Sequence, residues 1–153
     1  MSSIKLKAKK WKENLALLER DDKFSYIIDI ARDVKPFTDE YKNDIFKIRG
    51  CVSNLWVVPK PQKNLMYFEH DADAFITKGY ATIVLDIFNG NTKEDIIKNK
   101  DCIKELGIAE MLTAQRQSGL SNLVATILRY CEWLNGILSL ISIILTAIIA
   151  VVI

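Results

Sequence analysis

The sequence lacks the groups of side chains on which most metal sites and hydrolytic active sites depend. Its 153 residues include a single histidine, His70, and three cysteines, none of them in a CxxC motif. A structural zinc site takes four ligands from cysteine and histidine, so four such residues at scattered positions argue against a metal site within the chain. The GxSxG, GxxxxGKS/T and HExxH motifs of common hydrolases, nucleotide-binding proteins and metalloproteases are also missing.

The net charge and the cysteine content exclude further classes of function. The net charge of +2 is small and gives no indication of a nucleic-acid partner. An odd number of cysteines without a close pair argues against a disulfide framework and favours a reducing compartment, the cytoplasm. Residues 1–10 form a basic N-terminal segment, and we expect this terminus to be solvated and frayed.

The spacing of apolar side chains predicts helices on either side of a short strand region. Helices are expected near residues 11–18, 22–34, 73–88, 92–100 and 116–133. The third is expected to be capped by Asp71 or Asp73, and the fourth to begin with a capping box from Thr92 to Asp95. Two short apolar runs joined by a polar loop predict an antiparallel hairpin of residues 55–58 and 65–68.

The last twenty residues form a separate apolar segment. Residues 134–153 contain no charged side chain, and from position 137 onward only Ser139, Ser142 and Thr146 are polar. Twenty helical residues span about 30 Å, the thickness of the hydrocarbon core of a bilayer. Length and charge therefore favour a C-terminal transmembrane anchor. A helix buried in an oligomer and a tail produced by an altered reading frame are the alternatives.

Cysteine chemistry remains, and Cys51 is the candidate thiol. Cys102 and Cys131 lie in helical contexts, where cysteine is commonly packed as a small apolar residue. Cys51 instead follows Gly50 at a turn before the first predicted strand, where a thiol can be presented to a partner. Arg49 adjoins it and would favour the reactive thiolate. A packed turn cysteine would show the same pattern, so the residues alone leave both interpretations open.

The segment around Cys51 carries the most specific pattern of the chain. In Ile48-Arg-Gly-Cys-Val-Ser-Asn-Leu-Trp56, a Gly-Cys pair is followed by a serine and then a tryptophan. Three more segments follow the same order as a known family: Tyr26-Ile-Ile-Asp-Ile30, Asp71-Ala-Asp-Ala-Phe-Ile-Thr-Lys-Gly79, and Leu106-Gly107 with Leu112-Thr-Ala-Gln-Arg116 and Gly119-Leu120. Together they resemble the SufE family of sulfur-acceptor proteins, including its CsdE-like paralogue, over about residues 11–131. The chain departs from the family at Ala72, where serine is frequent, and in its apolar tail.

The resemblance implies an α+β fold for residues 11–133. A small antiparallel β-sheet would pack against helices, as in SufE and IscU-like proteins, and the apolar helix of residues 134–153 would follow. Cys51 matches the cysteine that receives sulfur, and the expected supports of its loop, which also shield a persulfide, are Gly50, Ser53 and Trp56. The positions expected to dock a partner or to cap helices are Arg49, Asp71, Asp73, Lys78, Gly79 and Arg116.

The function implied by the resemblance is that of an accessory sulfurtransferase in iron–sulfur cluster assembly, not of a stand-alone enzyme. Cys51 would take persulfide sulfur from a SufS/CsdA-like cysteine desulfurase, stimulate it, and pass the sulfur to a SufBCD-like scaffold. The pyridoxal phosphate would belong to the desulfurase, and we expect this chain to bind no cofactor and no metal. The alternatives are a membrane-tethered interaction protein that has lost the transfer and a scaffold that builds clusters itself.

Overall fold

The computed structural model describes residues 2–152, apart from the side chains at positions 134, 135, 138, 139, 142, 146, 147 and 149–152. Its α-helices are α1 (Ser3–Ala16), α2 (Arg20–Arg32), α3 (Phe75–Phe88), α4 (Lys93–Lys98) and α5 (Ala114–Val152). Short 3-10 helices are η1 (Asp39–Tyr41), η2 (Lys100–Leu106) and η3 (Ala109–Met111). The strands are β1 (Leu55–Pro59), β2 (Leu65–Met66), β3 (Phe68–Ala72) and β4 (Asn91–Thr92).

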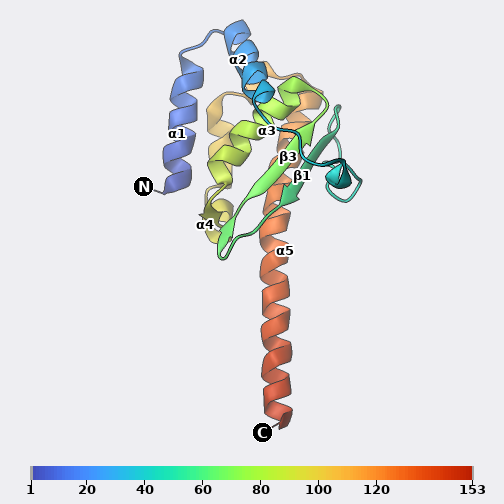
Figure 1. Cartoon of the computed structure of the whole chain (residues 1–153). Helices are drawn as coiled ribbons and strands as arrows, with labels where there is room; N and C mark the ends of the chain where they lie inside the picture. The colour runs from blue at the N-terminus through green and yellow to red at the C-terminus, as the bar shows by residue number, and fades with distance from the viewer. Residues whose placement is uncertain (1, 153) are drawn as a thin grey trace.

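Two small antiparallel sheets form the β part of the fold. β1 pairs with β3, from Leu55 opposite Ala72 to Pro59 opposite Phe68, and β2 pairs with β4. The predicted antiparallel hairpin is therefore confirmed, but its second strand starts at Phe68 instead of Leu65, because β2 turns aside to pair with β4. Helices and a small antiparallel sheet together confirm the predicted α+β class (Figure 1).

The central helix α3 organises the core. It is apolar on most sides, contacts α2, α5 and β3, and buries side chains along its whole length. Gly79 lies where α3 meets α2, and a Cβ at this position would collide with the backbone carbonyl of Ile27. Gly79 thus permits the close approach of the two helices, which fixes the position of the face of α3 that points toward Cys51.

One of the two predicted helix caps is wrong. α3 begins at Phe75, and its N-cap residue Ala74 provides no side-chain hydrogen bond. Asp71 lies within β3, and Asp73 bonds elsewhere, as described below. The cap of α4 is confirmed, because the Thr92 hydroxyl accepts a hydrogen bond from the backbone N–H of Asp95 at 3.2 Å.

The basic N-terminus is a docked helix, so the expectation of a frayed terminus is wrong. Ile4, Ala8 and Leu15 of α1 are buried. Lys7 Nζ donates hydrogen bonds to the carbonyl oxygens of Asp86 and Asn89 at 2.7 and 3.1 Å. A lysine at the C-terminal end of a helix satisfies carbonyls that have no helical partner and complements the helix dipole, so α1 is held against the end of α3.

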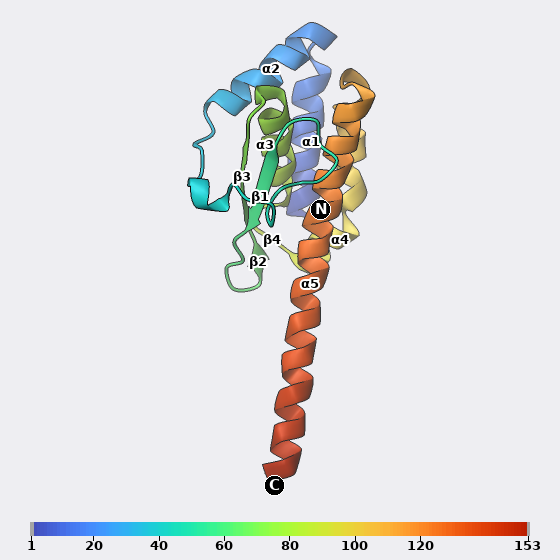
Figure 2. The same ribbon diagram turned by 90° about the vertical axis from the view of Figure 1, so that its right-hand side faces the viewer.

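Helix α5 continues without interruption through the boundary predicted at residue 134. Its first part packs on the body, with Leu120, Leu123, Ile127 and Cys131 buried, and the rest extends away from the body (Figures 1 and 2). The predicted anchor, 134–153, falls largely on side chains outside the described ones. Among the residues that the structure describes, no helix is long and apolar enough to cross a membrane.

Candidate functional site

Cys51 lies on a short loop, residues 49–54, that is closed by backbone hydrogen bonds at its base. The Ile48 N–H donates to the Leu55 carbonyl at 2.8 Å, and the Val57 N–H donates to the Phe46 carbonyl at 2.9 Å. The segment before the loop therefore pairs with β1, and Cys51 stands at the turn between them. We call residues 49–54 the Cys51 loop.

The backbone of the Cys51 loop requires a glycine at position 50. Gly50 has φ of 74°, in the left-handed region where a side chain is strained. A Cβ on Gly50 would also stand 2.5 Å from Asn122 Nδ2 of α5. The turn predicted at Gly50 is thus confirmed, and it places Cys51 next to α5.

Hydroxyl groups surround the half-buried thiol of Cys51. Cys51 Sγ lies 3.6 Å from Tyr80 Oη and 3.9 Å from Ser53 Oγ. The Ser53 hydroxyl is hydrogen-bonded in turn to Thr77 Oγ1 at 2.6 Å. Tyr80 and Thr77 are both fully buried on α3, so the sulfur faces fixed hydroxyl groups on its inner side.

Sequence reasoning missed Tyr80 and Thr77. Burial, together with its hydrogen bond to Cys51, raises the pKa of Tyr80 well above its ordinary value, so the phenol stays protonated at neutral pH. The two residues are three positions apart on α3, which places them on one helix face. This spacing is the one signal in the sequence that could have indicated them, and it is hard to recognise because α3 is apolar on most sides.

The glycine at position 119 of α5 makes room for the contact between Cys51 and Tyr80. A Cβ on Gly119 would lie 2.9 Å from Cys51 Sγ and 2.9 Å from Tyr80 Oη. Such distances are shorter than ordinary van der Waals contact. Three elements, the Cys51 loop, α3 and α5, therefore meet at one sulfur atom.

Asp73 holds the far end of the Cys51 loop. Its carboxylate accepts hydrogen bonds from the backbone N–H of Asn54 at 3.0 Å and from Asn54 Nδ2 at 2.8 Å, while the Asp73 N–H donates to the Asn54 carbonyl at 3.2 Å. The carboxylate that was expected to cap a helix or dock a partner thus joins the loop to the start of α3.

Asp71, a buried residue of β3, is the centre of an ion cluster. Its carboxylate is 3.1 Å from Lys42 Nζ and 2.7 Å from Lys78 Nζ, and only 3% of the residue is exposed. Burial alone would raise the pKa of Asp71, but hydrogen bonds from Lys78, Lys42 and the Ala72 N–H outweigh it and lower the pKa. With so little surface exposed, this carboxylate is placed for stability.

A cavity opens on the outer side of Cys51. It measures about 360 Å³ and is lined by Asp44, Lys47, Ile48, Arg49, Gly50 and Cys51. Arg49 is exposed on the loop. Arg116 of α5 also acts on the site, because its positive charge opposes the rise in the Tyr80 pKa. The sulfur thus has hydroxyls on one side and a cavity lined by charged residues on the other.

A family model of SufE, described as an Fe-S metabolism associated domain, matches residues 9–131. The chain belongs to the SufE family. The matched residues contain the whole Cys51 loop, all of α3 and the first part of α5.

Two SufE-like relatives come from rhizobia. An uncharacterized SufE-like protein of Rhizobium etli is 29% identical over 113 residues, which cover 70% of this chain and 76% of that protein. A second uncharacterized SufE-like protein, from Rhizobium meliloti, is 30% identical over 115 residues, covering 71% of this chain and 82% of its own length. These relatives support membership of the family.

The fold also resembles a solved structure. The solution structure of a hypothetical protein from Thermus thermophilus superposes with a TM-score of 0.68 over 82% of this chain and 93% of that chain. Its sequence identity is 16%, so the similarity concerns the fold alone.

Trp56, which the SufE resemblance places as a shield for the sulfur, lies in β1 opposite Asp71. It alternates with the core residues Leu55 and Val57, so it points to the other face of the strand. Ser53 is the predicted loop residue that reaches the thiol, through its hydroxyl.

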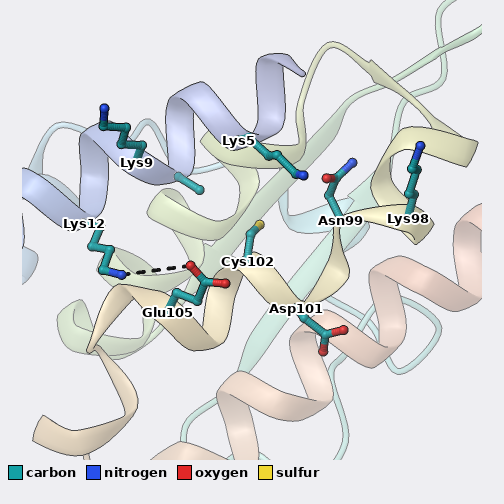
Figure 3. A pocket seen from close by; sticks show the side chains of 9 residues that line it. Lys5, Lys9, Lys12, Lys98, Asn99, Asp101, Cys102 and Glu105 are labelled. Carbon is teal, nitrogen blue, oxygen red and sulfur yellow. Dashed lines mark ion pairs between the residues drawn. The ribbon is translucent and has the colours of Figure 1, made fainter. Parts of the chain in front are cut away.

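The other two cysteines of this SufE-family chain have less reactive surroundings. Cys102 lies in a cavity of about 490 Å³ between α1 and η2, which we call the lysine-lined cavity (Figure 3); its lining is Lys5, Ala8, Lys9, Lys12, Lys98, Asn99, Asp101, Cys102 and Glu105. Burial and the charge of Glu105 raise the pKa of Cys102 to about 11, and burial raises that of Cys131 to about 11. Both thiols are therefore protonated at neutral pH.

His70 is a structural residue. Thr82 Oγ1 donates its proton to the Lys78 carbonyl at 2.8 Å, so it accepts from His70 Nε2 at 2.9 Å. Burial lowers the pKa of His70 to about 4, which keeps the ring neutral at neutral pH. In the part of the chain that the structure describes, no three His, Cys, Asp or Glu side chains are grouped to hold a metal ion.

Proposed function

We propose that this protein accepts sulfur for iron–sulfur cluster assembly, with Cys51 as the residue that carries it. The observation that supports this most is the position of the Cys51 thiol, at a turn between a cavity of about 360 Å³ and the hydroxyls of Tyr80 and Ser53. Membership of a family associated with Fe-S metabolism sets the context. Cys102 and Cys131, with pKa values near 11, are poor candidates for the same role.

The transfer is an exchange at sulfur. The Cys51 thiolate attacks the terminal sulfur of a persulfide on a cysteine desulfurase, and a new S–S bond forms at Cys51 Sγ. The S–S bond to the desulfurase cysteine breaks, and its electron pair leaves with that cysteine as a thiolate. The proton on the terminal sulfur remains there and is then released to water. No external oxidant or reductant is needed.

The site has features that suit a carried persulfide. The cavity beside Cys51 offers space for a donor side chain, and the half-buried sulfur is partly shielded from reductants in solution. A desulfurase would supply pyridoxal phosphate, and a scaffold that accepts the sulfur would act next. Stimulation of the desulfurase would follow from removal of sulfur from its cysteine.

Mass spectrometry tests the proposal directly. The full-length protein is incubated with a cysteine desulfurase, pyridoxal phosphate and free cysteine, next to Cys51→Ala and Cys102→Ala. We expect a gain of about 32 Da per sulfur on the Cys51 peptide in the parent and in Cys102→Ala, and none at position 51 in Cys51→Ala. Absence of added sulfur from the parent, with binding to the desulfurase intact, would instead support an interaction protein that has lost the transfer.

A further inference from the structure

We propose that Tyr80 donates a hydrogen bond from its phenol to the Cys51 thiolate and thereby holds and stabilises the attacking sulfur. The inference rests on the sulfur-acceptor function proposed above and assigns it a further residue. Tyr80 Oη lies 3.6 Å from Cys51 Sγ, nearer than Ser53 Oγ at 3.9 Å. Of these two hydroxyl groups, that of Tyr80 therefore lies closer to the reacting sulfur.

The direction of this hydrogen bond follows from the chemistry of the two groups. A thiolate has no proton to donate, so the bond runs from the phenol O–H to the sulfur. Tyr80 is fully buried, and burial together with its contact to Cys51 raises its pKa. The phenol thus keeps its proton at neutral pH and can donate a hydrogen bond to the sulfur.

The nearby Ser53 and Thr77 hydroxyls are hydrogen-bonded to each other. Ser53 Oγ and Thr77 Oγ1 are 2.6 Å apart, so one of them donates its proton to the other. Their mutual bond occupies one of their two protons and holds Ser53 toward α3. Tyr80 has a fully buried side chain, and its hydroxyl lies nearer the sulfur than that of Ser53, which suits a stabilising donor.

The absence of a side chain at Gly119 keeps the pair together. A Cβ there would stand 2.9 Å from both Cys51 Sγ and Tyr80 Oη. A methyl group would therefore push apart the two atoms that form the proposed bond. Gly119→Ala consequently tests the same contact without removing the phenol.

Charged groups also lie near Cys51 or Tyr80, on several elements. They include Asp44, Lys47 and Arg49 around the outer cavity and Arg116 on α5. All of them remain in a Tyr80→Phe variant, so a comparison of this variant with the parent isolates the phenol hydroxyl.

The hydroxyl affects the transfer step by stabilising negative charge. A donated hydrogen bond favours the thiolate over the thiol. Wherever the thiol form predominates, removal of this hydrogen bond should lower the thiolate fraction about 10- to 100-fold. The thiolate that remains is more nucleophilic, which offsets about half of this loss on a logarithmic scale. We therefore expect Tyr80→Phe to slow the reaction of Cys51 about 3- to 10-fold at neutral pH.

The experiment measures alkylation of Cys51 by iodoacetamide between pH 6 and 10, followed by peptide mass spectrometry on the full-length protein. The variants are Tyr80→Phe, Gly119→Ala and Tyr130→Phe. Tyr130 is a matched control, because its phenol donates to the Val57 carbonyl at 3.2 Å and not to a sulfur. Thermal unfolding of each variant shows whether it is folded, and alkylation in guanidinium chloride shows that the intrinsic thiol reactivity is unchanged.

The proposal predicts that the pH profile of Cys51 alkylation moves to higher pH in Tyr80→Phe and Gly119→Ala and stays in place in Tyr130→Phe. A Tyr80→Phe profile that coincides with the parent profile, in folded protein, would overturn it, as would an equal shift in Tyr130→Phe. If Tyr80→Phe does not fold, the Gly119→Ala profile decides. Because alkylation needs no desulfurase, failure of sulfur loading in the parent would reject the sulfur-acceptor function without affecting this result.

Discussion

The Cys51 loop and the lysine-lined cavity each contain a half-buried cysteine, but their surroundings differ in kind. On the inner side of Cys51, hydroxyl groups are paired, as in the Ser53–Thr77 hydrogen bond, and strand β3, which pairs with β1 after the loop, carries the buried Asp71–Lys78 ion pair. Around Cys102, the charged groups are exposed, and the Lys12–Glu105 pair is separated by 4.0 Å (Figure 3). Both thiols are half-buried, and we expect them to differ in reactivity because the hydroxyls beside Cys51 are fixed whereas the charged side chains around Cys102 are loosely held.

The largest expected effect on the free energy of unfolding comes from replacing a buried carboxylate, Asp71, rather than an exposed one, Asp101. Asp71→Asn leaves Lys78, whose side chain is only 12% exposed, without its negative partner. Removal of one member of a buried ion pair is strongly destabilising, and we expect a loss of about 3 kcal/mol in the free energy of unfolding. Asp101→Asn at the lysine-lined cavity breaks an ion pair with Lys104 in which both side chains are exposed. We therefore expect no measurable change in the free energy of unfolding.

Urea unfolding at pH 7 measures both variants. The pKa of Asp71 is lowered in the folded protein, so its contribution is present above about pH 4 and is lost as the pH falls through the folded pKa. The difference between Asp71→Asn and the parent should therefore shrink in strong acid. Equal urea midpoints for Asp71→Asn and Asp101→Asn at pH 7 would contradict the prediction that the buried ion pair contributes more to stability than the exposed one.

The next effect concerns the thiols themselves. A thiol of pKa about 11, such as Cys102, is about 300-fold less ionised at neutral pH than a free cysteine of pKa about 8.5. Greater nucleophilicity of its thiolate recovers about tenfold, so Cys102 should react about 30-fold more slowly than a free cysteine. We expect short treatment with iodoacetamide at pH 7 to label Cys51 first.

The pH dependence provides the control for this prediction. Labelling of Cys102 should rise about tenfold per pH unit until the pH approaches its pKa near 11, because the thiolate fraction rises in that proportion. Cys131 is completely buried and should stay unlabelled in the folded protein. Peptide mass spectrometry after timed labelling distinguishes the three. Faster labelling of Cys102 than of Cys51 at pH 7 would contradict the assignment of Cys51 as the accessible thiol.

The sequence was sufficient for the features that depend on local signals. The Gly50-Cys51 turn, the hairpin and the Thr92 cap all follow from residues that are close together in the chain. Tyr80 could not be found this way, and neither could the contact of Gly119 with Cys51, because both depend on the packing of α3 and α5. The wrong cap has a related cause: Asp71 and Asp73 are good cap residues, but contacts with Lys78 and Asn54 determine where their carboxylates lie.

The smallest expected effect compares two glycines with nearly equal backbone angles, Gly50 in the Cys51 loop and Gly107 at the end of η2. Their φ angles are 74° and 70°, so alanine at either position should cost about 1 kcal/mol in the free energy of unfolding. Only Gly50→Ala would also displace Asn122, whose Nδ2 lies 2.5 Å from the added Cβ, whereas the nearest atom at Gly107 is 3.9 Å away.

Gly50→Ala and Gly107→Ala therefore separate stability from the geometry of the site. We expect both to lower the urea midpoint by similar amounts, because the backbone strain is the same. Only Gly50→Ala should slow the labelling and sulfur loading of Cys51, since it alone moves the loop against α5. If both variants load sulfur at the parent rate, the contact between the loop and α5 does not position the thiol. If both variants load sulfur equally slowly, the general loss of stability accounts for the effect, and the contact between the Cys51 loop and α5 does not explain it.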